Sequence, residues 1–108
     1  MTASLKFYKD IRVSRELDYH YYFSPPELGK STLLFLHGFP STSHDWHRQI
    51  VYFQQRGYGI LAPDMLGSGQ TSRPLNSKEF RMNLMAADII EILDAEGLKQ
   101  VIGIAHDW

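Results

Sequence analysis

Cysteine is absent from the 108 residues of the chain. Its absence excludes a disulfide framework, a zinc site built on thiolates and a cysteine nucleophile. A chain without cysteine is also common among proteins of the reducing cytoplasm, which is where we expect this protein.

The chain also lacks an excess of charge of either sign, and it lacks a long apolar run. Lys and Arg number 11 and Asp and Glu number 12, so the formal net charge is -1. A nearly neutral chain lacks the excess of positive charge that binding to nucleic acid or to an anionic membrane favours. No stretch approaches the roughly 18 apolar residues of a membrane span, and the N-terminal segment has no signal-peptide core. We therefore expect no nucleic-acid partner and no membrane span.

What the chain does contain is ordinary globular composition, with 44% hydrophobic residues. Alternating polar and apolar residues predict two antiparallel, half-exposed strands at the start. Continuous apolar runs predict three later strands that are buried on both faces, as in a parallel sheet. Helical spacing of apolar residues predicts two helices, the first with Ser43 as its N-cap. The expected strands cover about 4–13, 17–24, 31–36, 59–65 and 100–104, and the expected helices about 44–56 and 78–96.

This order of elements predicts an α/β fold. Alternating strands and helices favour a mostly parallel sheet with helices on its faces, preceded here by two antiparallel strands. The last expected strand has no helix after it, so we interpret residues 1–108 as one truncated α/β domain. The open edge and uncovered apolar face of such a fragment predict self-association.

The first candidate for chemistry lies at the tip of the last strand. Asp107 follows the strand, two residues after the small residue Ala105. A small residue at that distance before a polar one is typical of a nucleophile elbow, because the tight turn leaves no space for a large side chain. A carboxylate is ionised at neutral pH and can attack an alkyl carbon without a base to activate it. Taken alone, the tripeptide also fits a polar residue near a chain terminus.

The second candidate is the segment His37-Gly38-Phe39-Pro40, which follows the apolar run Leu33–Leu36. An apolar strand followed by His-Gly and a proline-containing loop is typical of a loop that supplies one oxyanion-hole donor, here the backbone N–H of Phe39. The backbone N–H of Trp108, directly after the nucleophile, would be the other donor. A plain turn with a surface histidine is the alternative.

Taken together, these segments resemble the N-terminal part of the α/β-hydrolases, and most closely the epoxide hydrolase group. The resemblance rests on HGFP at 37–40, DMLGSG at 64–69 and HDW at 106–108, the last including His106. It implies Asp107 as nucleophile, the N–H groups of Phe39 and Trp108 as oxyanion donors, and a small apolar epoxide as substrate. The catalytic histidine, its acidic partner and the lid of that family lie further along its chains.

None of the five histidines is expected to be the catalytic base. His106 adjoins Asp107 on a tight turn and would point elsewhere, and His20 lies on a peripheral strand. The resemblance implies that His37 shapes the oxyanion loop and does not act as the base.

No cofactor and no metal ion are expected. His44, Asp45 and His47 could hold a metal ion, but their spacing fits a solvated helix surface better. The segment from Gly67 to Ser72 nearly matches a dinucleotide-binding fingerprint, but Pro74 falls where the fingerprint needs a helix. We interpret these glycines as a tight turn.

Three functions remain open from the sequence. The leading hypothesis is the nucleophile-bearing fragment of an epoxide hydrolase that forms an alkyl-enzyme ester, inactive by itself because the base and lid are missing. A haloalkane dehalogenase-like hydrolase shares the aspartate nucleophile, and the Trp108 indole could donate to a halide. A non-catalytic truncated product is the third.

Overall fold

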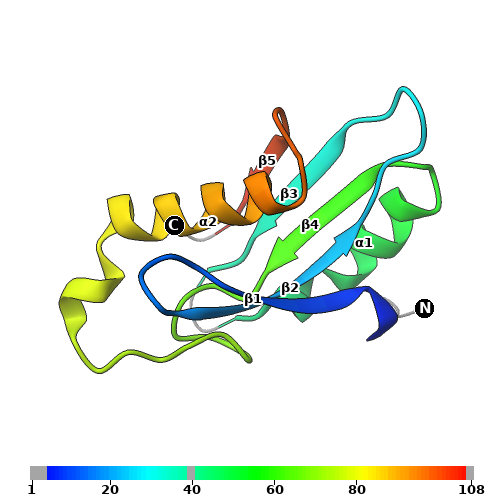
Figure 1. Cartoon of the computed structure of the whole chain (residues 1–108). Coiled ribbons are helices and arrows are strands. Elements are labelled where there is room, and N and C mark those ends of the chain that lie inside the picture. Colours follow the sequence, from blue (N-terminus) through cyan, green and yellow to red (C-terminus); the bar gives the residue numbers. More distant parts are fainter. Residues whose placement is uncertain (1–4, 39–40, 107–108) are drawn as a thin grey trace.

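The computed structural model describes residues 5–38 and 41–106, and it forms one five-stranded mixed sheet of order β1-β2-β4-β3-β5 (Figure 1). The first two strands are antiparallel, β2 also runs antiparallel to β4, and β3 is parallel to both β4 and β5. This arrangement confirms the predicted fold class. In chain order the elements are η1 (Leu5–Phe7), β1 (Tyr8–Arg12), β2 (Asp18–Ser24), β3 (Thr32–Leu36), η2 (Ser43–Trp46), α1 (His47–Gln54), β4 (Gly59–Pro63), η3 (Ser77–Phe80), α2 (Met82–Ala95) and β5 (Ile102–Ala105), where η marks a 3-10 helix.

The two α-helices cover opposite faces of the sheet, and each encloses a separate hydrophobic core (Figure 1). On the α2 face, Ile89 and Ile92 pack with Tyr19 and Leu61. On the α1 face, Ile50 packs with residues of the same strands that point the other way. Apolar side chains on both faces explain why β3 and β4 read as continuous apolar runs.

The expectation that the leading strands are half exposed is wrong for β2. Tyr19, Tyr21 and Tyr22 are at most 2% exposed, although they alternate between the two faces of the sheet. The reason is position, because β2 lies between β1 and β4 and helices cover both faces. β1 is an edge strand and keeps its polar side chains exposed.

Both helices differ from their predicted starts because each begins with a separate 3-10 turn. Thr42, and not Ser43, caps η2, since its side chain accepts a hydrogen bond from the backbone N–H of His44. Asn76 caps η3 in the same way, and α2 begins only after the extended residue Arg81. The backbone of Arg81 leaves the helical region, so the apolar periodicity continues across a break in the helix.

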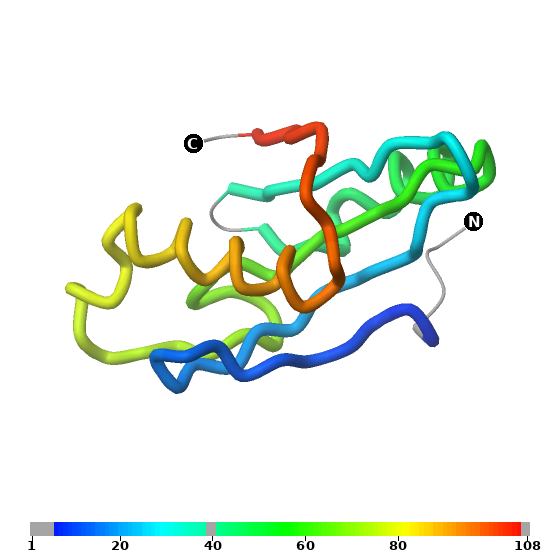
Figure 2. The backbone as a smooth tube through the Cα atoms, turned by 45° about the horizontal axis from the view of Figure 1, so that its top comes forward, coloured from blue at the N-terminus to red at the C-terminus, as the bar shows by residue number. Residues whose placement is uncertain are grey.

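The hairpin between β1 and β2 packs against η3 and α2. In Figure 2 this blue segment runs beside the yellow-green segment that leads into α2. The backbone N–H and hydroxyl of Ser14 both donate to the Glu91 carboxylate, at 2.8 and 2.7 Å. Arg15 reaches Glu79 and Asp88 from the same turn. These contacts fix α2 against the sheet.

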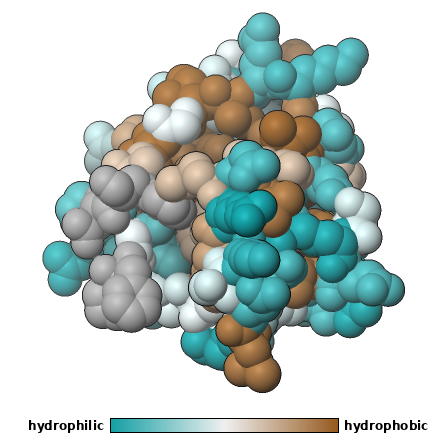
Figure 3. Space-filling model, turned by 90° about the vertical axis from the view of Figure 1, so that its left-hand side faces the viewer, coloured by the Kyte–Doolittle hydropathy of each residue, from teal (hydrophilic) through white to brown (hydrophobic). Residues whose placement is uncertain are grey.

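An apolar groove of about 320 Å³ runs between α2 and the ends of the parallel strands. Figure 3 views the end of the molecule at which these strands finish, and hydrophobic side chains gather in its upper part, on the side of α2. The groove is lined by Leu34, Leu36, Met65, Met82, Met85, Ala86, Ile89, Ile90, Leu93 and Ala105. Within residues 5–38 and 41–106, none of the helices has the length and apolarity needed to cross a bilayer.

Candidate active site

Two neighbouring strands, β3 and β5, end side by side, and one residue of each predicted motif, His37 or His106, directly follows its strand. β3 and β5 are parallel and in register, with Leu36 opposite Ala105. The backbone N–H of His106 donates to the carbonyl of Leu36 at 3.2 Å. Since the carboxyl ends of parallel strands meet at one edge, Gly38 and His106 leave the sheet at the same place. The predicted site residues Phe39, Pro40, Asp107 and Trp108 lie outside the described residues.

His37 ties this edge to the loop that follows β4. It is 3% exposed. Its Nε2 accepts a hydrogen bond from the backbone N–H of Met65, and its Nδ1 lies 2.8 Å from the carbonyl oxygen of Gly38. Because a backbone amide can only donate, Nε2 carries no proton and Nδ1 donates to Gly38. Both ring nitrogens are therefore occupied, and His37 holds two backbone segments together.

Of the other described histidines, His106 directly follows β5, whereas His20 is poorly placed to serve as a base at that end. His20 pairs with Asp10 at 2.8 Å, but it lies on β2, which β4 and β3 separate from β5. Three strand spacings of about 4.8 Å place β2 roughly 14 Å from β5, beyond the reach of a proton transfer. His44, within η2, and His47, the first residue of α1, stack on each other with their ring centroids 5.0 Å apart. Within the described residues, no group of three or more metal-ligating side chains is found.

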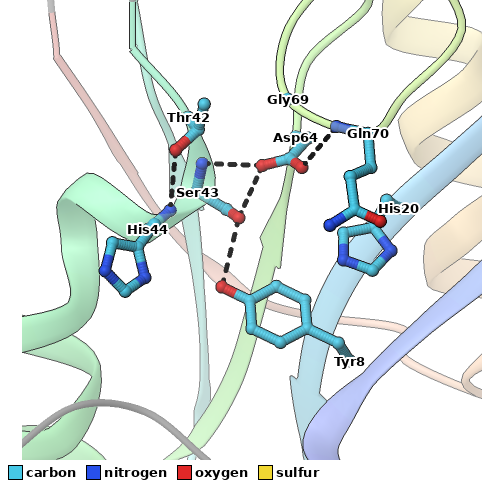
Figure 4. Close-up of a pocket in the computed structure, with 8 residues that line it drawn as sticks. All are labelled: Tyr8, His20, Thr42, Ser43, His44, Asp64, Gly69 and Gln70. Carbon is cyan, nitrogen blue, oxygen red and sulfur yellow. Dashed lines mark hydrogen bonds between the residues drawn. The ribbon is translucent and has the colours of Figure 1, made fainter. Parts of the chain in front are cut away.

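Asp64, the first residue of the DMLGSG motif, carries the most heavily hydrogen-bonded carboxylate at this edge, and no role was predicted for it from the sequence. Asp64 follows β4 and is 4% exposed. Its Oδ1 accepts from the backbone N–H of Ser43 at 2.8 Å and from the Ser43 hydroxyl at 2.6 Å. Its Oδ2 accepts from the backbone N–H of Gln70 at 3.1 Å. Figure 4 shows Ser43, at the start of η2, and Gln70, in the loop after β4, facing the carboxylate. An aspartate directly after a buried strand is the signal that could have identified it.

The glycines of the DMLGSG motif fold a loop around this carboxylate. Gly67 and Gly69 both have positive φ, at 82° and 51°. A Cβ at Gly69 would overlap the carboxylate oxygens of Asp64, and one at Gly67 would lie 2.9 Å from the Phe80 ring. The tight turn predicted here is therefore confirmed. The turn brings the backbone N–H of Gln70 within hydrogen-bond distance of the Asp64 carboxylate.

Gly69→Ala is expected to destabilise the protein more than Gly29→Ala. Both glycines have positive φ, but a Cβ at Gly29 would have no neighbour within 4 Å. Backbone strain alone costs about 1–2 kcal/mol, and displacing the buried Asp64 carboxylate adds about 2 kcal/mol. Urea unfolding of the full-length gene product measures the difference, and equal losses for the two variants would contradict this account of the loop.

Two cavities flank the Asp64 and His37 contacts. One of about 540 Å³ is lined by Tyr8, His20, Thr42, Ser43, His44, Asp64, Gly69 and Gln70 (Figure 4). Burial raises the pKa of Tyr8, and the Asp64 charge adds to the rise while the hydrogen bond with Ser43 opposes it. The Tyr8 hydroxyl therefore stays protonated at neutral pH. The Ser43 hydroxyl donates its hydrogen bond to Asp64, so Tyr8 is the donor in its contact with Ser43.

The second cavity, of about 350 Å³, lies directly at the ends of β3 and β5. It is lined by His37, Gly38, Ser41, Asp45, Trp46, Gln49 and His106. The indole Nε1 of Trp46 is buried and has no hydrogen-bond partner among the described residues. The volume suits a small ligand, and the cavity adjoins both predicted motifs, so we take it as the candidate active site.

The chain matches a known protein family over most of its length. A family model described as alpha/beta hydrolase fold matches residues 31–108. The chain belongs to the alpha/beta hydrolase fold family. The match starts just before β3 and includes both segments that converge on the candidate site.

Proteins similar to the chain include epoxide hydrolases. The chain is 36% identical to Epoxide hydrolase 2 of Siraitia grosvenorii over 76 residues, which are 70% of this chain and 24% of that protein. It is 34% identical to Epoxide hydrolase A of Mycobacterium tuberculosis over 82 residues, which are 76% of this chain and 26% of that protein. The chain thus spans about a quarter of the length of these relatives.

A solved epoxide hydrolase structure shares nearly the whole arrangement of strands and helices. An epoxide hydrolase from Vigna radiata superimposes with a TM-score of 0.82 at 31% identity. The superposition covers 98% of this chain and 32% of the Vigna radiata chain. It includes the two leading strands, which the family model does not reach.

Proposed function

We propose that the chain is the nucleophile-bearing part of an epoxide hydrolase that converts a small apolar epoxide into a vicinal diol. The observation that supports it best is the meeting of two strand ends, since HGFP begins where β3 ends and HDW begins where β5 ends. The similarity to epoxide hydrolases supports the reaction type.

In the first step Asp107 acts as the nucleophile. One of its carboxylate oxygens forms a bond to an oxirane carbon, and the bond from that carbon to the epoxide oxygen breaks. The released oxygen takes a proton from an acid outside the described residues. The product of this step is an ester between Asp107 and the opened substrate.

In the second step water hydrolyses the ester. Water adds to the carboxyl carbon of Asp107 and gives a proton to a general base outside the described residues. Negative charge develops on the carbonyl oxygen, and the backbone N–H groups of Phe39 and Trp108 stabilise it. Collapse of this intermediate expels the diol, whose leaving oxygen takes a proton back from the base, and loss of the remaining carboxyl proton to solvent restores the carboxylate. The two steps consume only the epoxide and water.

The full-length gene product is expected to convert a small apolar epoxide such as styrene oxide into its diol. Chromatography of the products measures the conversion, and an acid quench during turnover should trap an adduct with the mass of one substrate on the peptide that contains Asp107. A folded protein that forms neither diol nor adduct from a panel of such epoxides would overturn the proposal.

A further inference from the structure

Two adjacent residues after β4 hold both ends of the loop that carries the proposed oxyanion donor. At the start of the loop, the backbone N–H of Met65 donates to His37, which in turn bonds the carbonyl of Gly38 at 2.8 Å. At the end of the loop, the backbone N–H and the hydroxyl of Ser43 donate to Asp64. Phe39 lies between these two anchors in the sequence.

Asp64 is itself held rigidly, so it can act as a fixed support. Its backbone N–H donates to the carbonyl of His20 at 2.8 Å. Its carbonyl accepts from the Thr71 hydroxyl at 2.6 Å, and its carboxylate also accepts from the backbone N–H of Gln70. A buried carboxylate with three donors has little freedom to move, and a second carboxylate conformation would leave those donors unsatisfied.

We infer that Asp64, acting through Ser43, is a positioning residue for the oxyanion donor of Phe39. The inference rests on the proposed function, and it goes beyond the nucleophile and the donors by adding the support that sets their geometry. Ser43 is 1% exposed, so its two hydrogen bonds to Asp64 cannot be replaced by water without a rearrangement. Losing one of them releases the end of the loop.

The two chemical steps should respond differently to this loss. During attack on the epoxide, negative charge leaves the Asp107 carboxylate and moves to the epoxide oxygen. During ester hydrolysis, charge returns to the Asp107 carbonyl oxygen, which is where the oxyanion donors act. A displaced donor therefore slows the second step and leaves the first nearly unchanged. Displacements of about 1 Å can reduce a rate by as much as about 100-fold.

The test is rapid-quench kinetics on the full-length gene product, with the covalent adduct counted by mass spectrometry. In Ser43→Ala, adduct formation should stay within about twofold of the unmodified enzyme, ester hydrolysis should fall about tenfold, and the adduct should accumulate. In Asp64→Asn the rate of ester hydrolysis should fall further, by about 100-fold, because the amide places a donor against the N–H of Gln70.

Ser72→Ala is the matched control. It also removes one serine hydroxyl that makes a 2.8 Å hydrogen bond, but the partner is the backbone N–H of Asp18 in the hairpin. Both of its rates should stay within about twofold. Should Ser43→Ala unfold, Asp64→Asn still provides the comparison.

Equal slowing of both steps, or no change in either, would overturn the positioning role. An unmodified enzyme that hydrolyses epoxides without forming an adduct would instead overturn the proposed function. The two failures are therefore distinguishable.

Discussion

Asp107→Ala is expected to abolish epoxide hydrolysis, with a loss of about 10⁴-fold or more in kcat. The reason is that an alanine supplies no nucleophile to attack the oxirane carbon. Diol formation by the full-length gene product measures the effect, with circular dichroism to confirm that the variant folds.

Two control variants separate the loss of the nucleophile from a general effect of substitution. Phe39→Ala should be far milder, because its proposed contribution is a backbone N–H that alanine keeps. Asp10→Ala should retain most activity, since Asp10 lies on the edge strand and its side chain is 70% exposed.

The fate of the oxygen atoms tests the same nucleophile without any substitution. A single turnover in water enriched in the heavy oxygen isotope should leave the diol unlabelled and place the label in the peptide containing Asp107. The ester mechanism requires this, because water attacks the carboxyl carbon and an Asp107 oxygen leaves with the product. Label in the first diol and none in the enzyme would mean that water attacks the epoxide directly.

Asp88→Ala is expected to destabilise the protein by about 3–5 kcal/mol. The Asp88 side chain is 1% exposed and accepts hydrogen bonds from Arg15, at distances down to 2.6 Å, and from the Tyr19 hydroxyl at 2.6 Å. The loss of this carboxylate would leave the Arg15 guanidinium without its main counterion and the Tyr19 hydroxyl without a partner.

The ionisation behaviour of both partners agrees with this arrangement. The hydrogen bonds and charge of Asp88 raise the pKa of Arg15 above its usual range. Burial, and then the hydrogen bond to Asp88, raise the pKa of Tyr19. Arg15 thus stays charged and Tyr19 stays neutral while Asp88 accepts from both.

Arg12→Ala provides the comparison, because it removes an ion pair of similar length on the surface. The side chains of Arg12 and Asp18 are 62% and 53% exposed, so the loss should remain below about 1 kcal/mol. Urea unfolding of both variants measures the difference. Similar losses for Asp88→Ala and Arg12→Ala would show that the buried pair does not hold the hairpin to α2.

Some of the fold could be derived from the sequence because its signals are local. The run Leu33–Leu36 and the run after Gly59 are apolar at successive positions, which only strands covered on both faces require. The HGFP and HDW segments directly follow apolar strands, so the rule that parallel strands end at one edge placed them together. The breaks before α1 and α2 were not visible, because apolar periodicity continues through a 3-10 turn.

The contacts that organise the candidate site were decided by the tertiary structure alone. Ser43 meets Asp64 across 21 residues and Arg15 meets Asp88 across 73, and neither spacing has a local pattern. Such pairs exist only once strand order and register bring the loops together. The burial of β2 has the same origin. Its alternating pattern fits a strand with one covered face as well as a strand with two, and only the position of β2 between β1 and β4 decides between them. Periodicity determines which residues share a face, whereas the packing of distant elements determines whether that face is covered and which polar groups meet there.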